Sequence, residues 1–274
     1  MSPESSAADS PFPGVPLDRP SAARIYDYML GGYHNFEIDR QIAERFKVVY
    51  PDFSLTAQVN RAFLRRALDF VTAQGIDQFL DLGSGIPTAG NVHEIVAEPF
   101  PDARVVYVDI DPIAVAHSET ILRGNPNVAA IQGDIADAEA LLTHPKVTEL
   151  LDFSRPLGLI VLAVIHFVPD GERAVRAVDA FKAVLASGSY FILGTWTYDD
   201  APDYALAQYA ELTKATPTTA RPHSRAMVER YFSGLEMVEP GLVHSPAWRP
   251  DDPHDLMVDN PGRSLTWVGV ARKP

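Results

Sequence analysis

Short apolar runs alternate with helical segments along the chain from Gln78 onward. This alternation is typical of βαβ units, in which helices join parallel strands and cover the sheet. The expected strands are residues 79–82, 104–109, 128–131, 159–165, 190–194, 235–239 and 265–271. A long proline-containing connection joins the last two strands, so we expect them to pair antiparallel. The pattern predicts one doubly wound α/β domain with a seven-stranded, mostly parallel sheet and one antiparallel strand.

Helical patterns precede the expected sheet at residues 21–30, 38–46 and 54–75. Further helices are expected between the strands, at residues 89–98, 113–122, 138–143, 172–186, 204–213 and 225–232. Residues 1–20 contain five prolines among several serines, a composition that cannot bury enough apolar area to offset its ordering entropy. We expect a flexible arm over residues 1–20, a helical extension over 21–76 and the sheet domain over 77–274, the last two forming one structural unit.

Composition excludes several classes of chemistry and partner. The chain has no cysteine, which excludes disulfides, thiolate metal sites and a cysteine nucleophile. Its net charge of −13 disfavours nucleic acid and anionic lipid as partners. The longest apolar run, residues 157–165, is shorter than the roughly 20 residues of a membrane-spanning helix, and the first residues lack a signal-peptide pattern. We therefore expect a cytoplasmic protein with a small-molecule partner.

The first expected strand ends in the segment FLDLGSGIP, which runs directly into a helix. Gly83 and Gly85 let the backbone pass close to a ligand at the helix N-terminus, which predicts a nucleotide-like ligand. A dinucleotide fingerprint requires glycine or alanine where this chain has Thr88, and Pro87 lacks an N–H group that a pyrophosphate would use. Asp81 suits an amine-bearing or cationic ligand better than a phosphate. An ordinary strand–turn–helix connection is the alternative for this segment alone.

Two more expected strands end in acidic residues. Asp109 ends the second strand roughly 20 residues after the glycine segment, where doubly wound sheets place the carboxylate that meets the ribose hydroxyls. Asp111 is a helix cap followed by proline. Asp134 follows the third strand, where a turn is the alternative. Acidic residues at three successive strand ends, Asp81 included, predict a binding site at that edge of the sheet.

These segments resemble the class I S-adenosylmethionine-dependent methyltransferases, and within them a bacterial subfamily long catalogued as a domain of unknown function. The subfamily resemblance covers nearly the whole chain and rests on ARIYDYMLGG with Asn35 and Asp39, NRAF, PTAGNVH, VYVD, HFVPD and WRP. It implies a Rossmann-like fold and S-adenosylmethionine as cofactor, with glycines 83 and 85 at its methionine part, Asp109 at the ribose, and Asp134 with Ile135 at the adenine. Pro87 replaces the third glycine of the wider superfamily and is normal for the subfamily. The expected cofactor-binding residues are Asp81, Gly83, Ser84, Gly85, Asp109, Ile110, Asp134, Ile135 and Ala163.

Methyl transfer from a sulfonium is an in-line displacement, so positioning supplies about 7–11 kcal/mol of the barrier. A general base adds only about 10²–10⁴-fold. His166 follows the fourth expected strand at its carboxyl end, where open α/β sheets bind ligands, and it is the candidate base. A hydrogen-bonded structural histidine is an equally supported alternative. The segment AVIH lacks the proline-rich pattern of many nucleic-acid base methylases, and no metal site is expected.

The N-terminal helices carry a dense polar and aromatic group around Gly31 and Gly32. This composition suits a lid that excludes water and shapes an acceptor pocket, whereas a solvated helix packed on the sheet is the alternative. The expected lid or acceptor-site residues are Tyr33, His34, Asn35, Arg61 and Trp196. We expect a methyltransferase that acts on a small molecule. The alternatives are a non-catalytic S-adenosylmethionine-binding protein and a nicotinamide-dependent oxidoreductase.

Overall fold

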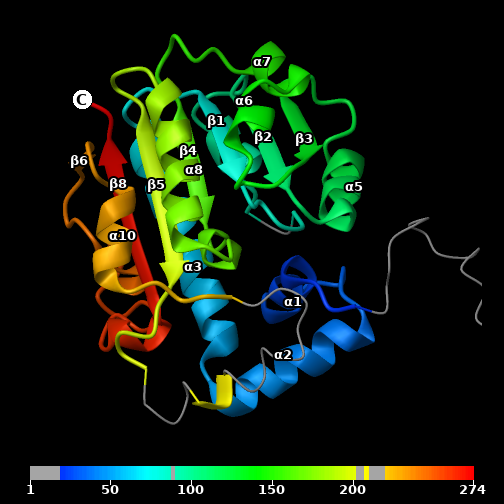
Figure 1. Cartoon of the computed structure of the whole chain (residues 1–274), viewed down its shortest axis with the longest axis vertical. Coiled ribbons are helices and arrows are strands. Elements are labelled where there is room, and N and C mark those ends of the chain that lie inside the picture. Colours follow the sequence, from blue (N-terminus) through cyan, green and yellow to red (C-terminus); the bar gives the residue numbers. More distant parts are fainter. Residues whose placement is uncertain (1–18, 88–89, 202–206, 210–219) are drawn as a thin grey trace, which may run out of the picture.

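The computed structural model describes residues 19–87, 90–201, 207–209 and 220–274, and a mixed sheet lies at its centre (Figure 1). The strands are β1 (Gln78–Leu82), β2 (Arg104–Asp109), β3 (Val128–Gln132), β4 (Gly158–Leu162), β5 (Tyr190–Trp196), β6 (Glu236–Met237), β7 (Val243–His244) and β8 (Thr266–Arg272). Their order is β3-β2-β1-β4-β5-β8-β6, with β7 paired to β8 outside this path. β1 to β5 run parallel, and β8 runs antiparallel to β5, β6 and β7. The predicted doubly wound, Rossmann-like fold with one reversed strand is confirmed.

Three strand predictions need correction. The described residues form an eight-stranded sheet in place of the predicted seven strands, because β7 is a two-residue strand too short to leave a sequence pattern. The sixth expected strand, residues 235–239, is shorter than predicted, because β6 has only two residues. The fourth expected strand, residues 159–165, ends at Leu162, since Ala163 adopts a left-handed backbone with φ of 57° and cannot continue an extended chain. The short 3₁₀ helix η2 (Ile165–Phe167) follows.

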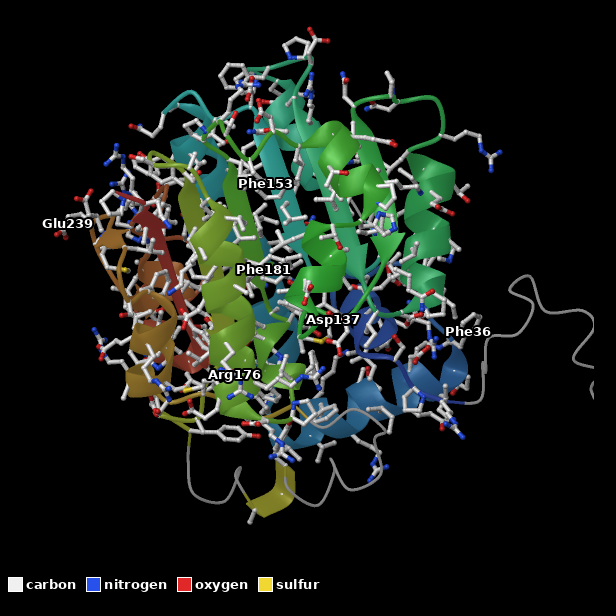
Figure 2. All side chains as sticks on the ribbon, turned by 45° about the horizontal axis from the view of Figure 1, so that its top comes forward. Phe36, Asp137, Phe153, Arg176, Phe181 and Glu239 are labelled. Atoms are coloured by element: carbon white, nitrogen blue, oxygen red, sulfur yellow. The ribbon has the colours of Figure 1, made fainter. Side chains whose placement is uncertain are left out.

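Helices cover both faces of the sheet, as a doubly wound fold requires. The helices of the sheet region are α4 (Val92–Ala97), α5 (Pro112–Ile121), α6 (Ala138–Leu142), α7 (Pro145–Leu150), α8 (Gly171–Val184) and α10 (Arg225–Tyr231). α6, α7, α8 and α10 pack on one face, where Phe181 of α8 is buried and labelled in Figure 2. α4 packs on the other face beside α3 (Phe53–Thr72). Most of the expected helix at 204–213 lies outside the described residues.

The N-terminal helices α1 (Ala22–Met29) and α2 (Glu37–Val49) lie across the carboxyl ends of the parallel strands, at the bottom of Figure 1. α3 continues from them and runs along the sheet, burying Phe63, Leu64, Ala67 and Leu68. None of the helices in the described part of the chain is long and apolar enough to span a membrane.

Candidate functional site

A cavity of about 530 Å³ lies between the carboxyl ends of the strands and the N-terminal helices. Ligands in open α/β folds bind at this edge of the sheet. Many of the residues that the sequence singled out line this cavity: Arg61, Asp81, Gly83, Ser84, Gly85, Asp109, Ile110, Ala163, His166 and Trp196. They come from the ends of β1, β2, β4 and β5 and from α3. The tertiary structure thus brings together residues that lie up to 135 positions apart in the chain.

The two glycines after β1 are required for different reasons. Gly83 has a φ of +75°, and a Cβ there would lie 2.3 Å from the Cβ of Val164, so the segment after β4 leaves no room for a side chain. Gly85 has a φ of +67°, but no heavy atom of the described structure lies within 4 Å of its would-be Cβ. Close packing therefore requires the first glycine, whereas the left-handed backbone requires the second. The resulting turn presents its backbone to the cavity.

Asp109 is held in place by backbone groups on both of its carboxylate oxygens. Its Oδ2 accepts the N–H of Gly85 at 2.7 Å, and its Oδ1 accepts the N–H of Asp111 at 2.8 Å. Burial raises the pKa of Asp109, while these N–H donors oppose the rise. A carboxylate has about four acceptor sites. Asp109 is therefore fixed by the glycine segment and retains acceptor capacity toward the cavity.

Asp81 and Arg61 place opposite charges at the same end of the cavity. Burial raises the pKa of Asp81 to about 7, an effect that the Arg61 guanidinium opposes and the Asp109 carboxylate reinforces. Arg61 donates to the carbonyl oxygen of Gly90 at 2.6 Å. The Asp and Arg side chains of the described cavity wall are Arg61, Asp81, Asp109 and Asp111. This polar end is acidic overall and suits a ligand that carries positive charge.

Asp111 also ties the N-terminal helices to this edge of the sheet. Its Oδ1 accepts the N–H of Ile113 at 2.8 Å and so caps α5, which confirms the predicted cap. Its Oδ2 accepts a hydrogen bond from the Ser21 hydroxyl and lies 3.9 Å from the Arg24 guanidinium. Arg24 in turn donates to Asp39 at 2.7 Å, and both side chains are buried. These contacts hold α1 over the cavity.

Three of the expected lid residues, Tyr33, His34 and Asn35, are not part of the cavity wall. Tyr33 is 94% exposed. The backbone N–H of His34 and the side-chain amide of Asn35 donate to the buried Asp27 carboxylate at 2.9 and 2.8 Å. A Cβ on Gly32 would overlap the same carboxylate, at 2.1 Å from its Oδ1. The polar residues around the two glycines thus build the turn between α1 and α2, close to Phe36 at the start of α2 (Figure 2).

Asp134 and Ile135, expected at the adenine, also lie outside the cavity wall. The Oδ1 of Asp134 accepts the N–H of Ala136 at 2.8 Å, which corresponds to the turn considered as the alternative. Ile135 is buried in the core between the sheet and the helices. Ile110, another expected cofactor-binding residue, is exposed and does line the cavity.

His166 is buried at the far side of the cavity, and its Nδ1 is engaged by the protein. Nδ1 accepts the backbone N–H of Trp196 at 3.3 Å and lies 3.2 Å from the Thr195 hydroxyl. Because Nδ1 accepts a hydrogen bond, the proton of the neutral ring is assigned to Nε2. Burial, with a contribution from His223, lowers the pKa of His166 to about 3. A general base works best with a pKa near the operating pH, so this geometry does not support that role.

Apart from Arg61, sequence reasoning missed the cavity residues contributed by the N-terminal helices. Ile25, Tyr26 and Met29 of α1 line the wall, as do the α2 and α3 residues Phe46, Phe53, Thr56, Asn60 and Leu64. Thr56, Asn60 and Leu64 follow one another at intervals of four, which places them on one face of α3. The available signal was Asn60, a polar residue between the apolar residues Val59 and Phe63 of the same helix.

The chain is similar to methyltransferases over nearly its whole length. The sequence profile of a family described as S-adenosyl methyltransferase matches residues 11–274. A proposed methyltransferase of Thermobifida fusca YX, known from a crystal structure, is 38% identical, with a TM-score of 0.88 and coverage of 96% of this chain and 99% of that one. A DUF574 family protein of Streptomyces avermitilis MA-4680 is 34% identical, with a TM-score of 0.85 and coverage of 94% and 99%. A search of curated proteins found no match.

Proposed function

The chain belongs to the S-adenosyl methyltransferase family, and on that premise we propose that it transfers a methyl group from S-adenosylmethionine to a small-molecule acceptor. The observation that carries the proposal is the polar end of the cavity. There the glycine segment, the fixed Asp109 carboxylate and the Asp81–Arg61 pair share one wall. These are the groups that a zwitterionic amino acid joined to a nucleoside requires.

The residues present fit S-adenosylmethionine. Asp81 would hold the ammonium and Arg61 the carboxylate of its amino-acid part, and Asp109 would accept hydrogen bonds from the ribose hydroxyls. The backbone at Gly83 and Gly85 approaches without an intervening side chain. The volume of about 530 Å³ is within the roughly 300–1,000 Å³ of small-ligand sites.

When bound, S-adenosylmethionine supplies an electrophilic methyl carbon that a nucleophile attacks in line with the departing sulfur. The chain's own contribution is positioning, the larger effect in such a reaction. Asp109 and the glycine segment fix the position of the cofactor. The N-terminal helices, which are hydrogen-bonded to the sheet through Asp111, enclose the cavity and exclude water. Proton transfer to His166 is not part of the proposal, because its Nδ1 is occupied.

Binding without turnover is the second candidate function, and it is favoured by the same engagement of His166. Family membership gives the nicotinamide-dependent alternative no support. Turnover separates the two remaining functions: a methyltransferase converts S-adenosylmethionine to S-adenosylhomocysteine only when an acceptor is supplied, whereas a binding protein leaves it intact with every acceptor.

Calorimetric titration with S-adenosylhomocysteine tests the cofactor site. Asp109→Asn should weaken binding at least about tenfold, because hydrogen bonds to a charged acceptor contribute about 1.5–3 kcal/mol each. Asp102→Asn is the matched control, since this exposed carboxylate lies before the amino end of β2, at the edge of the sheet away from the cavity, and it should bind normally. NADH should not bind. Absence of S-adenosylhomocysteine binding, or equal losses in both variants, would overturn the assignment.

A further inference from the structure

The end of the cavity away from the carboxylates is built from aromatic side chains. The rings of Phe46 and Phe53 are 5.1 Å apart, and Phe53 lies 6.3 Å from Trp196. Trp196 meets Tyr209 edge-on at 4.9 Å, and Phe46 lies 5.8 Å from the same tyrosine. These four side chains come from α2, α3, the end of β5 and residues 207–209. We call this set the aromatic wall.

The aromatic wall contains no charged group. The Asp and Arg side chains that line the described cavity gather at the other end, where Asp81 interacts electrostatically with both Arg61 and Asp109. Moving an unpaired ionised group from water against apolar side chains costs far more than burying a neutral one. Among the described residues, a charged acceptor group would find no partner in these four side chains, whereas the face or edge of a neutral aromatic ring packs well there.

His166 adds one directed polar group beside this wall. Its ring lies 6.2 Å from that of Trp196, lines the cavity and is only 5% exposed. Nδ1 is taken up by the Trp196 backbone, so Nε2 carries the proton and can only donate. Within the described part of the chain, no residue is hydrogen-bonded to Nε2. Nε2 is therefore available to donate to an acceptor atom on a ligand in the cavity that His166 lines.

We propose that the aromatic wall binds an uncharged aromatic methyl acceptor, which packs against Trp196 and Phe46 and accepts a hydrogen bond from Nε2 of His166. The inference rests on the proposed function and specifies its substrate class. The atom that His166 contacts is a ring nitrogen, carbonyl or ether oxygen other than the attacking atom, because donation to the nucleophile would withdraw its lone pair. His166 is thus a binding residue that remains neutral throughout.

Binding of matched probes to the protein saturated with S-adenosylhomocysteine tests the proposal. The probes are quinoline, naphthalene and 2-naphthoate, which share a bicyclic aromatic frame. Quinoline differs from naphthalene by a ring nitrogen, and 2-naphthoate adds a carboxylate group to naphthalene. In ligand-observed NMR titrations, quinoline should bind about fivefold more tightly than naphthalene, the effect of one net hydrogen bond. Binding of 2-naphthoate should be at least about tenfold weaker than that of quinoline, because its carboxylate is buried unpaired.

Three variants locate this binding. Trp196→Ala should weaken quinoline and naphthalene alike, by about tenfold. His166→Phe keeps a ring but removes the donor, so it should abolish the preference for quinoline over naphthalene. Phenylalanine also removes the acceptor of the Trp196 N–H, so the ratio of the two affinities is the readout. Tyr33→Ala is the control, because Tyr33 is 94% exposed and lies outside the cavity. Unchanged binding to Trp196→Ala, or equal binding of 2-naphthoate, would overturn the proposal.

Nitrogen NMR of the histidine rings gives a test on the unmodified protein, which holds even where a variant fails to fold. His166 should show a protonated Nε2 and an unprotonated Nδ1 from pH 5 to pH 8. A proton on Nδ1, or an imidazolium in this range, contradicts the proposal. The two proposals fail separately. If the unmodified protein binds S-adenosylhomocysteine but no aromatic probe, only the proposed acceptor class is wrong. If it does not bind S-adenosylhomocysteine, the proposed function itself is wrong.

Discussion

We expect the protonation of Asp81 to make cofactor binding dependent on pH. Burial raises the pKa of this carboxyl from its ordinary 3.8 to about 7 in the ligand-free protein, yet pairing with a ligand ammonium requires the ionised form. At pH 7 about half of the molecules have ionised Asp81, and at pH 5.5 about 3% do. The affinity for S-adenosylhomocysteine should therefore fall about 16-fold between these two values.

The ligand's own groups do not obscure this effect. Even at the end of a peptide chain, the pKa is about 7.7–8.0 for an α-amino group and about 3.3–3.7 for an α-carboxyl group. In a free amino acid the two charges stabilise each other and move both values further out, so both groups keep their charge between pH 5.5 and pH 7. Calorimetry in two buffers of different ionisation enthalpy should detect release of about 0.9 proton per ligand at pH 6. Asp81→Asn should bind more weakly at pH 7 and lose most of the pH dependence. An equal affinity at pH 5.5 and pH 7, or the same slope in the variant, would refute the reasoning.

The same raised pKa has a consequence for stability. Because the folded pKa lies above the unfolded one, the contribution of Asp81 is most favourable below about pH 4 and is lost as the pH rises through 7. Asp81→Asn should therefore stabilise the ligand-free protein at pH 8, by up to about 4 kcal/mol, and have little effect at pH 4. Urea unfolding at both values measures the difference, and stabilisation of equal size at pH 4 would contradict the cause assigned here.

Two further predictions concern the supports of the site. Arg24→Met leaves the buried Asp39 carboxylate without its ion pair and should destabilise the protein by about 3–5 kcal/mol in urea unfolding. The control is Arg65→Met on the exposed face of α3, which should change stability by less than about 1 kcal/mol. Similar losses in the two variants would contradict the stabilising role given to the buried pair. Gly83→Ala should destabilise the fold by about 1–3 kcal/mol more than Gly75→Ala. Both glycines have positive φ, but only the first leaves no space for a Cβ, so equal thermal shifts would contradict the packing argument.

Local patterns predicted the elements whose formation depends on neighbouring residues. β2 has the predicted bounds, residues 104–109, because a short apolar strand followed by an acidic cap and proline is encoded within a few positions. The end of β4 was not predictable in this way. Ala163 adopts a left-handed backbone within an apolar run that reads as a continuous strand, and its N–H is taken by the carbonyl of Gly194 at 2.8 Å.

The state of His166 also depended on residues distant in the sequence. Its place after a strand made it a candidate base, but the hydrogen bond from Trp196, 30 positions away, assigns its ring proton to the other nitrogen. Burial then lowers its pKa. Neither the tautomer nor the burial of a side chain can be read from its immediate neighbours, because both are set by whatever the fold packs against the ring.

The sequence by itself determined the doubly wound sheet, the glycine turn and the acidic edge formed by Asp81 and Asp109. These features follow from periodicity and strand ends, and parallel strands bring their carboxyl ends to one edge whatever the side chains. Only the tertiary structure decided which helix residues enclose the cavity. The contact that seats α1 joins Ser21 to Asp111, 90 positions away, and such long-range pairing leaves no periodic trace in either segment. The polar residues around Gly32 for this reason resembled a binding site in the sequence, whereas the fold uses them to close a turn around Asp27.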